Sequence, residues 1–167
     1  MGVVLVNVRG ITIGTLLSAT LVLAACQNDS EQQGIAAEQQ LPERYVEQQQ
    51  LYDEALMAIQ TLHNEFDSVD AQEVEAYYTN RLNVWRDVMN DYLNGLKEVY
   101  PEEQWTALTT AQEEWRKNME NYANIVASTY EDEAAARTAY LTEKEQRTKV
   151  RARELLDNYY FNLPAQQ

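Results

Sequence analysis

Apolar residues recur at helical spacing along most of the chain, and the pattern is clearest over residues 78–99. There the apolar side chains alternate steps of four and three residues, which places them on one face of an α-helix. Asp70 followed by Glu73 predicts a variant capping box at the start of this helix. Pro101 ends it, because a proline disfavours helical geometry at the residue before it. The apolar positions are Tyr78, Leu82, Trp85, Met89, Tyr92, Leu96 and Val99.

A shorter amphipathic helix is predicted before it, over residues 43–66. Pro42 suits the first turn of a helix, and residues 67–70 interrupt the apolar pattern. Every seventh residue is apolar and further apolar residues fill the alternate positions, which is typical of a helix with one buried face. These residues are Tyr45, Tyr52, Ile59 and Phe66, with Ala55 and Leu62 between them.

Two more helices are predicted after Pro101. Ser128 with Glu131 predicts a capping box for the last one, residues 130–160, and Pro164 follows its end. The stripe of the third helix again steps by three and four, with one polar member: Trp105, Leu108, Gln112, Trp115, Met119, Tyr122 and Val126. The stripe of the last helix is less apolar: Ala134, Thr138, Leu141, Glu145, Thr148, Ala152, Leu155 and Tyr159.

The scarcity of turn residues supports a fold built only of helices. Five Gly and three Pro in 167 residues are few for a sheet protein, which needs turn residues at short intervals. We therefore predict an all-α fold, an antiparallel bundle of about four helices over residues 43–167. Gly95 costs about 1 kcal/mol against Ala inside a helix, so we expect a close helix contact near Leu96. The short connections leave little room for a cleft.

The first 25 residues have the composition of a targeting leader. They hold no acidic residue and one basic residue, Arg9. An apolar run of about 15 residues follows, which is too short to span a bilayer comfortably. It ends Leu23-Ala24-Ala25-Cys26, which resembles a bacterial lipobox, so we expect cleavage before Cys26 and lipidation of its thiol. An ordinary secretory peptide with a free Cys is the alternative.

A flexible tether is predicted between the lipidated Cys26 and Pro42. Residues 27–41 are rich in Gln, Asn, Glu, Ser and Ala and lack an apolar stripe. The alternative is that their second half extends the first helix. The lipidation signal implies a lipid-anchored protein of the bacterial cell envelope. Gln27 after the Cys favours the outer membrane, facing the periplasm, in a Gram-negative cell, by resemblance to lipoprotein sorting rules.

The charge and the rare residues exclude several kinds of function. With 13 basic and 27 acidic side chains, the chain lacks the Lys and Arg surplus that binds nucleic acid. One Cys and one His exclude an internal disulfide, a Cys-rich zinc site and a metal site with two His ligands. No Gly-rich phosphate loop or nucleophile elbow is present, so we expect neither enzyme activity nor a cofactor. The acidic clusters indicate solvated helix faces or attraction of a basic partner.

Three short strings in the last three helices resemble one family. They are residues 92–96 (YLNGL), residues 108–115 (LTTAQEEW) and residues 141–148 (LTEKEQRT). Over residues 75–160 the chain resembles the lysozyme-inhibitor LprI-like family of small bacterial envelope proteins, in a variant without helix cysteines. Gln112, Trp115 and Arg147 match the family's positions and are carried over as candidate binding residues.

The resemblance and the lipobox together predict a non-enzymatic, lipid-anchored module that binds a protein. Its most specific form is inhibition of a basic lysozyme, and the alternative is a structural or scaffolding lipoprotein of the envelope. Gln112 and Trp115 lie one turn apart, so core packing is the competing role for both. We expect Arg147 to pair with Gln112 or a carboxylate inside the bundle, or to be an exposed charge. Residues 159–161 (YYF) belong to the core or form an exposed patch.

Overall fold

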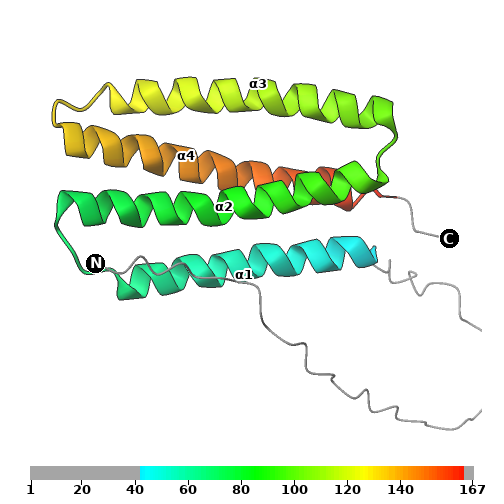
Figure 1. Ribbon diagram of the computed structural model, residues 1–167, viewed down its shortest axis with the longest axis horizontal. Helices are drawn as coiled ribbons and strands as arrows, with labels where there is room; N and C mark the ends of the chain where they lie inside the picture. The colour runs from blue at the N-terminus through cyan, green and yellow to red at the C-terminus, as the bar shows by residue number, and fades with distance from the viewer. Residues whose placement is uncertain (1–41, 164–167) are drawn as a thin grey trace, which may run out of the picture. The chain divides into compact units, whose positions relative to one another are not determined.

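Residues 42–163 are described by the computed structural model, and they form four long helices and one short π-helical turn (Figure 1). Successive helices run antiparallel, which confirms the predicted all-α bundle. No helix in this part of the chain is long and apolar enough to cross a membrane. The predicted leader, the lipidated Cys26, the tether and Pro164 lie outside the described residues. The elements are α1 (Glu43–Glu65), α2 (Ala71–Val99), α3 (Glu102–Ala127), α4 (Glu133–Leu155) and η1 (Leu156–Tyr160).

The helices lie side by side in an order that differs from their order along the chain. Figure 1 shows α4 between α2 and α3, with α1 on the other side of α2. α4 packs against both α2 and α3, while α1 packs against α2 and η1. Because α4 separates them, α2 and α3 meet at the connection around Pro101 and diverge toward their other ends (Figure 1).

The helix starts follow capping chemistry, with one correction to the sequence prediction. Asp70 caps α2 as predicted, since its Oδ1 accepts from the backbone N–H groups of Gln72 and Glu73 at 2.9 and 3.1 Å. The other half of the predicted capping box is replaced, because the Asp70 N–H donates to Ser68 Oγ at 3.1 Å and not to Glu73. The predicted capping box of Ser128 and Glu131 is wrong. Asp132 caps α4 instead, accepting from the Ala135 N–H at 2.7 Å, because a carboxylate adjacent to the first turn reaches its free N–H groups. Ser128 is the C-cap of α3.

The largest buried side chains come from α2, the end of α4 and η1. The predicted stripe of α2 is confirmed at its centre, where Leu82, Trp85, Tyr92 and Leu96 are all buried. The prediction for α3 is wrong at Tyr122, which is 52% exposed, while its neighbour Ala123 is completely buried. The small Ala123 faces α4 and allows the helices to approach, so the larger tyrosine lies on the flank of the contact.

Gly95 is the position where the close contact expected near Leu96 occurs. A Cβ at Gly95 would overlap the hydroxyl of Tyr160. That hydroxyl donates to the backbone oxygen of Tyr92 at 2.7 Å, and the Tyr160 side chain is only 1% exposed. Tyr160 therefore belongs to the core, whereas Phe161 is 45% exposed and contacts the ring of Tyr45 edge to face.

Candidate functional site

The basic side chains of α4 attach this helix to the other three. Of the 13 basic residues, only Arg9 precedes residue 42, so the described part holds 12, and six of these lie on α4. Four of the six bond to another helix, which compensates for the weak apolar stripe of α4. The bonds are Arg137 to Glu75 at 2.8 Å, Lys144 to Glu120 at 2.7 Å, Arg151 to Gln112 at 2.9 Å and Arg153 to Gln49 at 2.9 Å.

A buried ion pair holds α4 against α2. Glu145 is 2% exposed, and its Oε1 accepts from Arg81 Nε and from a terminal guanidinium nitrogen at 3.1 and 2.8 Å. Arg81 also donates to the Tyr77 hydroxyl at 2.8 Å, which lies 3.2 Å from Nδ1 of His63 on α1. Burial alone would lower the pKa of Arg81, but the hydrogen bonds to Glu145 and Tyr77 outweigh it and the pKa is raised. The sequence indicated Glu145 on the stripe but not its partner, which lies beside the buried Leu82.

Gln112 joins three helices at the interior of the bundle. Its side-chain nitrogen donates to Met89 Sδ on α2 at 3.2 Å, and its oxygen accepts from Arg151 Nε on α4 at 2.9 Å. The pairing of Gln112 with Arg147 is therefore wrong, because Arg151, one turn further along α4, occupies that position. Gln112 has the structural role that competed with binding in the sequence analysis.

Arg147 and Trp115 lie instead on the outer side of the α3–α4 contact. Arg147 pairs with Glu143 on its own helix at 2.5 Å. Its guanidinium carbon is 4.0 Å from the centre of the Tyr122 ring. Trp115 is half-buried and precedes Tyr122 by seven residues, which places both rings on one side of α3.

Exposed apolar side chains continue this surface. Ile125 follows Tyr122 by three residues and is 61% exposed, and Val150 follows Arg147 by three residues and is 56% exposed. Aromatic and arginine side chains of this kind are enriched where proteins bind one another. We call this surface the outer α3/α4 face; it comprises Trp115, Tyr122, Ile125, Arg147 and Val150.

A groove opens on the opposite side, where α2 and α3 diverge above α4. Its volume is about 1010 Å³. The sequence analysis left little room for a cleft, and this expectation is wrong because α4 lies between α2 and α3 and keeps their far ends apart. The groove is lined by Ala71, Gln72 and Glu75 of α2, by Asn124 and Ala127 of α3, and by Asp132, Glu133, Ala134, Ala136, Arg137 and Tyr140 at the start of α4.

Charged contacts order the α4 side of the groove. The guanidinium of Arg137 lies 5.4 Å from the centre of the Tyr140 ring while it pairs with Glu75. The Tyr140 hydroxyl and Lys144 Nζ both donate to the carboxylate of Glu120 on α3. These hydrogen bonds, that of Lys144 first, outweigh the effect of burial and hold the pKa of Glu120 below its ordinary value. Tyr140 and Lys144 are thereby fixed between α3 and α4.

Comparisons with known proteins were made by family, by sequence and by structure. No protein-family model matches this chain, and neither the curated proteins nor the solved structures include a match. Within residues 42–163, no three His, Cys, Asp or Glu side chains are grouped so that they could hold a metal ion.

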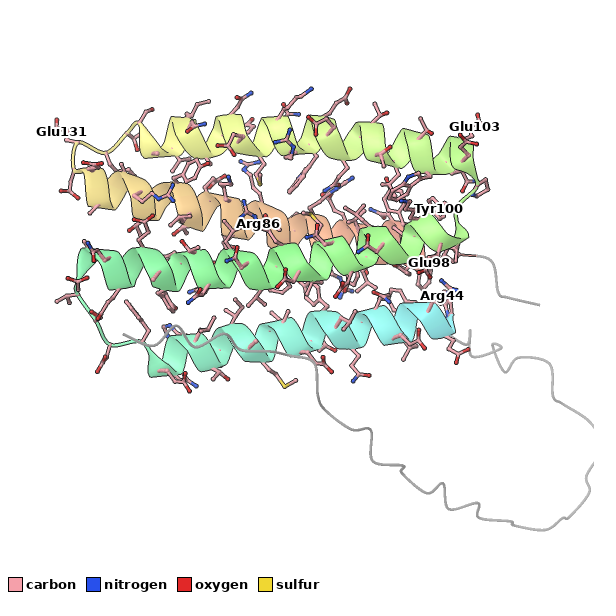
Figure 2. All side chains as sticks on the ribbon, in the orientation of Figure 1. Arg44, Arg86, Glu98, Tyr100, Glu103 and Glu131 are labelled. Carbon is pink, nitrogen blue, oxygen red and sulfur yellow. The ribbon has the colours of Figure 1, made fainter. Side chains whose placement is uncertain are left out.

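The charge of the molecule is divided unequally between α4 and the rest. Of the 27 acidic residues, three precede residue 42, so the described part holds 24, of which only four lie on α4. The remaining 20 acidic residues share the rest of the bundle with six basic ones. Among the described residues, Glu102, Glu103 and Glu114 are exposed and make no ion pair. Figure 2 shows Glu103 at the start of α3 and Glu131 in the connection between α3 and α4.

Proposed function

We propose that this chain is a non-enzymatic protein-binding module of the bacterial cell envelope that binds a basic partner protein. The observation that carries this proposal is the unequal charge distribution. Outside α4 the described residues hold 20 acidic and six basic side chains, so the surface of this part of the bundle is strongly acidic. An acidic surface attracts a basic protein and raises the rate of association.

Inhibition of a basic lysozyme is the most specific form of this proposal. It is supported by the resemblance of residues 75–160 to the LprI-like family and by the basic character common among lysozymes. Of the three family-matching positions, Trp115 and Arg147 lie on the outer α3/α4 face, whereas Gln112 lies between helices. A partner would then be attracted by the carboxylates before it docks.

Lipid on Cys26 would keep the module at the membrane. One acyl chain holds a protein only marginally, and two already anchor it firmly. A tether of about 16 residues reaches roughly 55 Å when extended, which would let the bundle meet its partner away from the lipid surface. In a Gram-negative cell the proposed location is the periplasmic side of the outer membrane.

The test is a lysis assay with the mature chain carrying Cys26→Ser, so that it remains in solution. Peptidoglycan is digested by a basic animal lysozyme at about 20 mM and at about 300 mM salt, which correspond to long and short screening lengths. We expect slower clearing of the suspension at low salt and little effect at high salt. Full lysozyme activity at low salt with excess module would overturn the lysozyme form of the proposal.

A scaffolding lipoprotein is the second candidate, and the outer α3/α4 face favours it. Tyr122, Ile125 and Val150 are each more than half exposed there, so two copies could bury them against each other. Sedimentation equilibrium of the mature chain separates the candidates. A dimer that dissociates on Ile125→Asp would support scaffolding, whereas a monomer at all concentrations would exclude self-pairing through this face.

A further inference from the structure

We infer that the groove between α2 and α3 is the docking site of the basic partner and receives a segment bearing lysine or arginine side chains. This inference rests on the proposed function and assigns it a place on the molecule. The groove is about 1010 Å³, at the top of the range of ligand pockets, about 300–1,000 Å³. It is open to solvent and not an enclosed cavity, which suits a piece of polypeptide better than an enclosed small molecule.

The charge of the groove is complementary to a basic segment. Three carboxylates, those of Glu75, Asp132 and Glu133, line it against the single guanidinium of Arg137. Arg137 is already engaged by Glu75 and by the Tyr140 ring. Glu133 makes no ion pair with a described residue, so its carboxylate is available to an incoming lysine or arginine. Asp132 adds a second negative charge, although one of its oxygens caps α4.

The shape of the groove allows a close approach of another backbone. Small side chains line each of its helices, among them Ala71, Ala127 and Ala136. The ring of Tyr140 is held in place by its hydrogen bond to Glu120. It already accepts one cation on its face, Arg137, and an arginine or lysine of the partner could make the same contact.

The outer α3/α4 face is less suited to a basic segment. Its neighbouring carboxylates, Glu143 and Glu154, are paired with Arg147 and Arg151 at 2.5 and 2.9 Å. A lysine approaching this face would meet two guanidinium groups. The face offers apolar area but no uncompensated negative charge, whereas the groove offers both small apolar side chains and carboxylates.

The experiment compares two charge variants of the full mature chain, with Cys26→Ser in each. The groove variant is Glu75→Gln with Glu133→Gln, and it leaves the Asp132 cap of α4 intact. The matched control is Glu47→Gln with Glu114→Gln, which removes the same charge from two exposed positions that do not line the groove. Binding to a basic animal lysozyme is measured by calorimetry at low salt. We expect the groove variant to bind about tenfold more weakly and the control to change about twofold or less.

A second pair of variants tests the shape without changing the charge. Ala127→Trp fills the groove from α3, while Ala107→Trp adds the same ring at an exposed position outside it. We expect Ala127→Trp alone to weaken binding, with both variants retaining the circular dichroism spectrum of the parent chain. If Ala127→Trp also loses that spectrum, the charge variants alone decide the outcome, each checked by the same spectrum because Glu75→Gln removes the ion pair with Arg137.

The outcomes separate the groove from the proposed function. If the groove and control charge variants bind lysozyme equally weakly, the whole acidic surface contributes to binding. This result would overturn the groove as the docking site but not the proposed function. No binding of lysozyme by the unaltered chain at low salt would overturn the lysozyme form of the proposed function and the groove with it. Weakening confined to the groove variants would support both.

Discussion

The hydroxyl of Tyr160 donates a hydrogen bond to the backbone oxygen of Tyr92 at 2.7 Å, in the space that a Cβ at Gly95 would occupy. In an exposed helix interior, Gly→Ala stabilises by about 1 kcal/mol. Here we expect Gly95→Ala to lower the free energy of unfolding by about 1–3 kcal/mol, because the rigid, buried ring cannot move aside. Urea denaturation of the two proteins measures the difference.

Tyr160→Phe provides the control for the effect of Gly95→Ala. Tyr160→Phe removes the hydroxyl that the new Cβ would meet and leaves the ring in place. The double variant should therefore be more stable than the sum of the two single losses predicts, which a double-mutant cycle detects. Strict additivity would mean that Gly95 and Tyr160 do not conflict.

The buried pair of Arg81 and Glu145 is expected to be the most sensitive ionic contact. The Glu145 side chain is 2% exposed and the Arg81 side chain 19%, so Glu145→Ala would leave a guanidinium partly buried without its partner. We expect a loss of about 3 kcal/mol in the free energy of unfolding, and a smaller loss for Glu145→Gln, which retains an acceptor. In the exposed pair of Arg116 and Glu113, Glu113→Ala should leave the melting temperature unchanged. Equal effects at the two pairs would contradict the importance of burial.

Acid should weaken the contact between α3 and α4 through Glu120. Its pKa in the folded chain is held below the ordinary value of 4.5 by hydrogen bonds from Lys144 and Tyr140. A carboxyl group with a lowered folded pKa contributes stability that is complete above its unfolded pKa and is lost as the pH falls through the folded one. We expect the unfolding free energy to fall below about pH 4.5, and to fall less steeply in Glu120→Gln. Urea titrations from pH 7 to pH 3, with Glu114→Gln as the exposed control, measure the two slopes.

Removal of the lipid attachment site should release the protein from the membrane. In bacteria expressing the full chain with Cys26→Ser, we expect the protein in the soluble fraction after lysis, whereas the parent chain sediments with the membranes. Two or more acyl chains anchor a protein firmly, so the difference should be nearly complete. Labelling of the parent chain with radioactive palmitate gives the direct readout, and labelling that survives the substitution would refute lipidation at Cys26.

The helices could be predicted because the spacing of apolar residues within each one shows which of its faces is buried. The steps of four and three residues identify Leu82, Trp85, Tyr92 and Leu96 as buried, and the local chemistry of Asp70 identifies the start of α2. These features depend on contacts within one helix or on one face of it. They do not depend on which other helix covers that face.

The features that could not be predicted all depend on which helices pack against one another. A single stripe could not show that α4 inserts between α2 and α3, so the groove was missed. Arg147 and Arg151 are four residues apart and both face α3, yet only Arg151 reaches Gln112. Tyr122 and Ala123 are neighbours on α3, and only the smaller side chain, that of Ala123, is buried. The burial of Glu145 on the stripe of α4 could not be explained from the sequence, because its partner, Arg81, lies 64 residues earlier.

The position of α4 between α2 and α3 sets the order in which the contacts of the bundle can form. α3 emerges from the ribosome before the helix that provides its main packing surface, and the three helices made first are predominantly anionic. A nascent chain lacking α4 would therefore lack the main packing surface of α3 and carry an excess of negative charge. The contact between α3 and its main neighbour can therefore form only after the last helix has been made.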